Sequence, residues 1–142
     1  MAYAPKRRIH PLAFVPLVAA LSVAAPAAAE DRCTDDGTVC WTRARGAAFV
    51  PGKRTTRRDR RRRGRRSPGT LSVNIVGGRG SVFLNGRYVG TAPLSAVTVP
   101  NGRNEIEIRD GMVVLASGRL SMPSGGVITL TVRAPAAVPT MP

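Results

Sequence analysis

The sequence predicts an all-β protein, built as a small β-sandwich of short antiparallel strands. Between residues 69 and 133, hydrophobic and polar residues alternate over several short stretches. Turn pairs that contain glycine separate these stretches, and no window of useful length has helical periodicity. A region of this size buries only ~60% of its unfolded surface, so we expect a small but viable folding unit.

The first predicted strand is LSVNIV, residues 71–76, which places Leu71, Val73 and Ile75 on one face. The stretch SVFLNGRYV follows as two short strands around Asn85 and Gly86. This dipeptide tolerates the two positive φ angles of a type I′ turn, so it predicts a tight hairpin.

Two further strands complete the predicted sandwich. NEIEIR alternates, with Ile106 and Ile108 on one face and the charged residues on the other. VITLTVR alternates again, with Ile128, Leu130 and Val132 directed inward.

The register of the predicted hairpin yields a candidate partner face. A two-residue turn places Phe83 opposite Tyr88 and Val82 opposite Val89, so that the aromatic pair and the valine pair occupy different faces. If the valine face lies in the core, Phe83 and Tyr88 are exposed and can contact a sugar or a protein. The alternative is that these rings cover a second patch of core.

Residues 1–29 are predicted to be a signal peptide. Basic residues at positions 6–8 precede an uncharged, apolar stretch over residues 12–29 that ends in small residues typical of a cleavage site. The alternative is an uncleaved membrane anchor. Both interpretations place the rest of the chain outside the cytoplasm, in the periplasm, at the cell surface or in the medium.

Residues 30–49 are predicted to form a separate short segment with a disulfide between Cys33 and Cys40. An exported chain meets an oxidising compartment, and Asp36 and Gly37 provide a turn between the two cysteines. A metal site is the competing interpretation, but it lacks further ligands because the only histidine, His10, lies in the signal.

Residues 50–68 are predicted to be a disordered, arginine-rich linker. Residues 43–66 contain 12 basic residues and one acid, and charges of one sign repel and extend a chain. Such an arm can bind lipid phosphates, lipopolysaccharide, acidic glycans or extracellular DNA; the alternative is a plain spacer. No specific nucleic acid is expected, because no aromatic residue is interleaved for base stacking. The candidate polyanion contacts are Arg57, Arg58, Arg60, Arg61, Arg62, Arg63, Arg65 and Arg66.

Residues 69–133 resemble the PEGA domain, a small β-sandwich module of exported and membrane-attached bacterial proteins. The similarity lies in GTLSV, in SVFLNGRYVG, in GTAPL and in the strand entry PNGRNEIEI. Gly78, Arg79, Gly80 and Ser81 stand where the family has Pro-x-Gly-Ala. The resemblance implies a non-catalytic envelope or interaction module without a common ligand, followed here by a Pro/Ala tail over residues 134–142.

We expect neither an enzyme nor a cofactor or metal. Glu105 and Glu107 share a strand face, but Arg103 and Arg109 lie beside them, which is typical of a solvated strand face. The sequence therefore predicts an exported binding or scaffolding protein of the bacterial envelope, with an unknown protein or glycan as partner. The alternative is a polyanion-binding protein that acts through the arginine-rich arm, and a small hydrolase is a third, disfavoured class.

Overall fold

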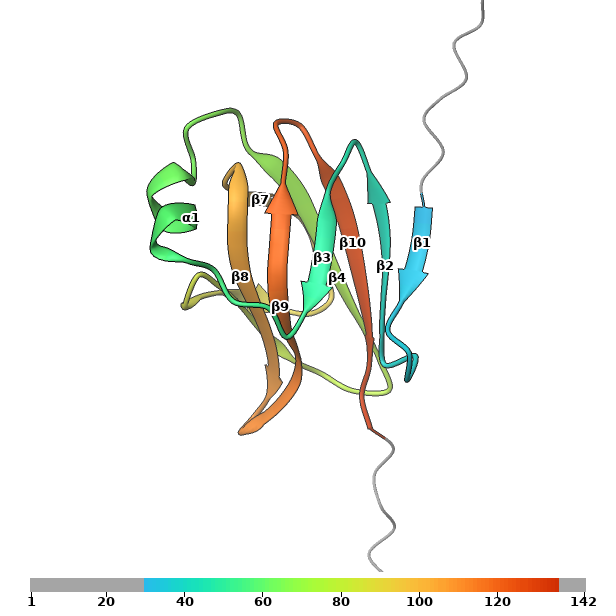
Figure 1. Ribbon diagram of the computed structural model, residues 1–142. Coiled ribbons are helices and arrows are strands. Elements are labelled where there is room, and N and C mark those ends of the chain that lie inside the picture. Colours follow the sequence, from blue (N-terminus) through green and yellow to red (C-terminus); the bar gives the residue numbers. More distant parts are fainter. Residues whose placement is uncertain (1–29, 136–142) are drawn as a thin grey trace, which may run out of the picture.

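Two five-stranded sheets pack face to face in the computed structural model, which describes residues 30–135 (Figure 1). The strands are β1 (Glu30–Cys33), β2 (Val39–Ala44), β3 (Ala48–Pro51), β4 (Gly69–Val76), β5 (Ser81–Leu84), β6 (Arg87–Thr91), β7 (Leu94–Val99), β8 (Gly102–Asp110), β9 (Val113–Met122) and β10 (Val127–Arg133). One sheet has the order β1-β2-β10-β4-β7, and the other has the order β3-β9-β8-β5-β6. The predicted all-β sandwich is confirmed, whereas the predicted signal peptide and most of the tail lie outside the described residues.

The alternating residues form the core between the sheets. Of the inward positions that alternation predicts, only Ile75 is partly buried, and it packs against the core. The others are buried, and they are Leu71, Val73, Ile106, Ile108, Ile128, Leu130 and Val132. One strand pair departs from the expected antiparallel arrangement, because β10 runs parallel to β4. The chain between these two strands supplies most of the opposite sheet, together with β7, which pairs antiparallel with the other edge of β4.

The predicted boundary at residue 69 is wrong, because residues 30–51 supply three strands of the sandwich. Strand β2 pairs with β10, and β3 pairs with β9. Trp41 and Phe49 are buried, and their rings meet edge to face with centroids 5.3 Å apart. Trp41 therefore belongs to the common core. The predicted disulfide between Cys33 and Cys40 is confirmed, and it joins two residues that face each other across β1 and β2.

The prediction of a disordered linker over residues 50–68 is also wrong. The first two of these residues end β3, and Arg57–Arg62 form the helix α1, which packs against β8 (Figure 1). Charges of one sign repel one another and favour an extended segment. The structure shows that contacts with β8 outweigh this repulsion.

The predicted hairpin forms around Asn85 and Gly86, whose φ angles are 53° and 78°. Phe83 lies opposite Tyr88 as expected, but Val82 lies opposite Gly90 and not opposite Val89. A β-bulge causes this shift, since it adds one residue to β6. The bulge moves Val89 out of the expected pairing.

We expect the fragment 69–133 to lack a cooperative thermal unfolding transition. Removing β1, β2 and β3 exposes the edges of β10 and β9 and deletes the buried Trp41 and Phe49 side chains. The chain from Glu30 onward should unfold in one cooperative step, because it retains every described strand. Circular dichroism melts of both proteins test this expectation. A fragment that melts cooperatively at a similar temperature contradicts it.

Candidate polyanion-binding site

Eight arginines of α1 and the turn that follows it cluster at one end of the sandwich. Seven of their side chains are exposed, and only Arg63 is partly buried. We call this cluster the arginine cap, and its members are Arg57, Arg58, Arg60, Arg61, Arg62, Arg63, Arg65 and Arg66.

The helix begins at a capping box formed by Thr56 and Asp59. The backbone N–H of Asp59 donates to the Thr56 hydroxyl oxygen at 3.1 Å, and the Thr56 N–H donates to the Asp59 carboxylate at 2.9 Å. These two bonds satisfy backbone donors that a helix start leaves without partners. The spacing of Thr56 and Asp59 is the local signal from which α1 could have been predicted.

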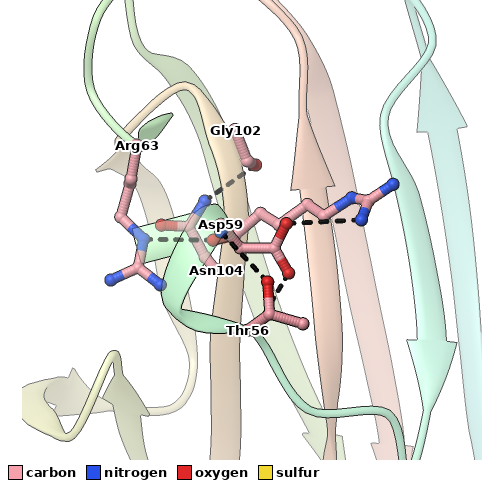
Figure 2. Close-up of polar contacts among 6 residues, drawn as sticks. Thr56, Asp59, Arg63, Gly102 and Asn104 are labelled. Carbon is pink, nitrogen blue, oxygen red and sulfur yellow. Dashed lines mark hydrogen bonds and ion pairs between the residues drawn. The ribbon is translucent and has the colours of Figure 1, made fainter. Parts of the chain in front are cut away.

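Asp59 is the one acidic residue within α1, and it is buried. One guanidinium nitrogen of Arg103, on β8, lies 3.3 Å from the Asp59 carboxylate (Figure 2). The hydrogen bond from the Thr56 N–H lowers the pKa of Asp59 below its ordinary value of 3.8, and the Arg103 charge lowers that pKa further. In its ionised form, Asp59 thus links the start of α1 to β8.

The end of α1 docks on the start of β8, whose one edge pairs with β9 while the other edge is left uncovered by β5. Strand β5 ends at Leu84, opposite Ile106, so the beginning of β8 extends beyond it. Arg63 Nε donates to the Arg103 carbonyl at 3.0 Å, and the Gly64 N–H donates to the Asn101 carbonyl at 2.7 Å. The arginine segment therefore satisfies backbone acceptors that the short β5 leaves open.

A buried asparagine, Asn104, stabilises the part of β8 on which the arginine segment docks. The Asn104 amide donates to the carbonyls of Pro100 and Gly102 at 2.9 and 3.2 Å, and it accepts a bond from the Asn85 side chain at 2.9 Å. These bonds hold the turn before β8, against which Arg63 lies (Figure 2). Asn104 shares the inward face of β8 with Ile106 and Ile108, so alternation alone predicts its burial but not its role.

The side chains of the seven exposed arginines of the cap make no hydrogen bond or ion pair with other residues in the described range 30–135. Arg63 is different, because burial lowers the pKa of its guanidinium below the ordinary value, while Glu105 opposes that shift. The nearby Arg60 charge lowers the Arg63 pKa as well. The cap therefore combines fixed backbone with crowded, uncompensated positive charge.

The aromatic pair predicted as a partner face lies apart from the cap, on β5 and β6. The rings of Phe83 and Tyr88 meet with centroids 5.9 Å apart, and Tyr88 remains 58% exposed. The Arg109 guanidinium lies 5.5 Å from the centroid of the Phe83 ring. Phe83 is thus shielded on two sides, and Tyr88 is the more accessible member of the pair.

A groove of about 550 Å³ runs over the outer face of β8, beside Phe83. Its two carboxylates already have partners: the Thr55 hydroxyl donates to Glu105 at 3.2 Å, and Arg109 bonds to Glu107. Lys53 and Arg54 line the same groove. The groove is therefore lined by the cations of Lys53 and Arg54 and by two carboxylates that already have hydrogen-bond partners.

No group of three or more histidine, cysteine, aspartate or glutamate side chains suited to a metal ion occurs among residues 30–135. In the same part of the chain, no helix is long and apolar enough to cross a membrane. Comparisons with family models, with curated proteins and with solved structures found no match for this chain.

Replacing Thr56 by alanine should destabilise the protein by about 1 kcal/mol, the usual cost of losing an N-cap side chain. The hydroxyl that accepts the Asp59 N–H bond is lost in this variant. Urea denaturation measures the change in the free energy of unfolding. Thr56→Ser is the matched control, because serine retains the acceptor and should remain close to the wild type.

The stabilising effect of Asp59 should depend on pH. Its pKa is lowered in the folded state, so the carboxylate stabilises the fold above pH 3.8, and this stabilisation is lost as the pH falls through the folded-state pKa. The wild type should therefore be more stable than Asp59→Asn near neutral pH, and the difference should shrink in acid. Paired denaturation curves from neutral to acidic pH test this, and a difference that grows in acid contradicts it.

Proposed function

We propose that this protein is an exported, non-catalytic binding protein of the bacterial cell envelope that holds polyanions on the arginine cap. The observation that carries the proposal is the combination of seven exposed arginines without described partners and a backbone that β8 holds in place. A spacer needs no such attachment to the sheet.

Attachment of the cap favours binding in two ways. The backbone of residues 56–64 is already ordered, so less conformational entropy is lost when a ligand binds than with a disordered arm. The arginines also repel one another, and an anionic polymer relieves this repulsion while its counterions are released.

The composition of the cap supports binding without sequence selectivity. Residues 57–66 contain no aromatic side chain, and Phe83 and Tyr88 lie on other strands. Contacts limited to backbone charge do not read bases or particular sugars. The natural ligand is therefore defined by its charge density, as in lipid phosphates, acidic glycans or extracellular nucleic acid.

Two contacts support a role without catalysis. Glu105 and Glu107, the carboxylates in the groove, are engaged by Thr55 and Arg109. Export is supported by the Cys33–Cys40 disulfide, which is typical of oxidising compartments, and by the predicted signal in residues 1–29.

A second candidate function is scaffolding through a protein partner at the Phe83 and Tyr88 face. The exposed Tyr88 ring, which packs against Phe83 of the groove, favours it, since tyrosine is enriched where proteins meet. Under this alternative, Tyr88→Ala should abolish partner binding and leave the affinity for polyanions unchanged.

The affinity for heparin and for duplex DNA should fall steeply with salt, because each neutralised phosphate on duplex DNA contributes about 0.9 to the log–log slope. Changing Arg57, Arg58 and Arg61 to serine should weaken binding to both polymers and lower the DNA slope by about 2 to 3. Fluorescence anisotropy at several salt concentrations measures both quantities.

The matched control changes three exposed arginines outside the cap to serine, namely Arg79, Arg87 and Arg133. It alters the net charge equally and should retain most of the affinity. Equal losses in both variants would show that net charge, and not the cap, determines binding, and they would contradict the proposal.

A further inference from the structure

We infer that the polyanion bound by the arginine cap is an anionic lipid surface, on which the sandwich docks by the end that carries α1. This inference rests on the proposed function and names the partner of the same site. Three features of the molecule carry it: the place where the described chain begins, the distribution of charge, and the spread of cations over one end.

The described chain begins at the same end of the sandwich as α1 (Figure 1). Glu30 pairs with Arg43 near the end of β2, and the next residue of β2, Ala44, pairs with Val127 at the start of β10. Strand β4 also begins at this end, since Thr70 pairs with Val127. Helix α1 docks beside the start of β8, next to the turn at Asn101.

The stretch directly before Glu30 is apolar in sequence. Residues 12–29 contain no charged side chain and directly precede Glu30 in the sequence. If this segment remains attached as a membrane anchor, the arginine cap lies beside the lipid headgroups. If it is cleaved, the cap alone must supply the contact. An attached anchor would thus place the same end of the sandwich toward the membrane as contact through the cap does.

Charge is unevenly distributed between the two ends of the sandwich. The only acid within the cap segment is Asp59, which is buried and paired with Arg103. The opposite end carries acids in its loops, including Asp36 in the β1–β2 turn and Asp110 at the end of β8. The exposed Arg79 and Arg133 lie at that end too and offset its acids, so the excess of positive charge is concentrated at the cap. A negatively charged surface therefore attracts the cap end more strongly than the opposite end, and it orients the protein.

Exposed cations also lie on both sides of this end of the sandwich. Arg45 is exposed in the β2–β3 turn, where the neighbouring Gly46 approaches Pro123. Helix α1 lies at the other side of this end, against β8. A broad arrangement of this kind matches a planar array of headgroups better than one polymer strand.

A rival lipid contact exists at the opposite end. Met112 is 97% exposed at the tip of the β8–β9 hairpin, and Val113 and Val114 are about half exposed. This apolar tip could enter a bilayer, and docking by the tip would orient the sandwich the other way. The experiment therefore has to identify the end that contacts lipid.

The first test is flotation of the chain from Glu30 onward, which retains every described strand and the disulfide. Vesicles contain either roughly equal parts of phosphatidylglycerol and phosphatidylcholine, or phosphatidylcholine alone. We expect binding to the anionic vesicles only. Replacing Arg57, Arg58 and Arg61 by serine should reduce that binding on the order of 100-fold, because each cation near an anionic surface raises the membrane affinity about fivefold. The Arg79, Arg87 and Arg133 control should lose far less.

The second test locates the contact by paramagnetic broadening of backbone amide signals from a gadolinium-labelled lipid. Broadening of residues 57–66 supports the inference, and broadening of Gly111 to Val114 overturns it. Binding to heparin without binding to anionic vesicles refutes the lipid surface but leaves the proposed function standing. If the protein binds neither heparin nor anionic vesicles, the lipid inference and the proposed function are both refuted.

Discussion

The short strand β5 creates the constraint on which the arrangement of the charged segment depends. Because β5 ends at Leu84, the backbone at the start of β8 extends past its neighbour with open carbonyls. Arg63 and Gly64 supply the missing donors to Arg103 and Asn101. A chain segment that would otherwise remain extended by its own charge is thereby held against the sheet. Each such bond contributes about 1 kcal/mol, and the capping box adds a comparable amount.

The same contacts determine which charges remain free. Asp59 is used internally, between the Thr56 N–H and Arg103, so the helix has no acid left to neutralise its outer surface. Glu105 and Glu107 are likewise engaged by residues on the face of the sheet. The carboxylates closest to the cap therefore already have partners, whereas the arginines of the cap remain exposed. This separation of charge underlies both the proposed polyanion binding and its orientation toward a lipid surface.

The groove over β8 and the arginine cap are adjacent but differ in chemistry. The groove contains paired carboxylates and a shielded Phe83 ring, whereas the exposed cap side chains have no described partners. A partner that needs shape and aromatic contact suits the Tyr88 side of the molecule, and one that needs charge density suits the cap. The two surfaces can be tested separately because different residues form them.

Alternation in the sequence determined which side chains enter the core, as at Ile106, Ile108 and Leu130, and the Asn85–Gly86 pair determined the hairpin. These features are local, because a strand directs successive side chains to opposite faces whatever its partner. Only the tertiary structure decided that residues 30–68 are part of the folded sandwich. Pairing of β2 with β10 joins segments far apart in the chain, and the attachment of α1 depends on carbonyls exposed where β5 stops. Local charge predicts an extended segment, and only these distant backbone partners overcome its repulsion.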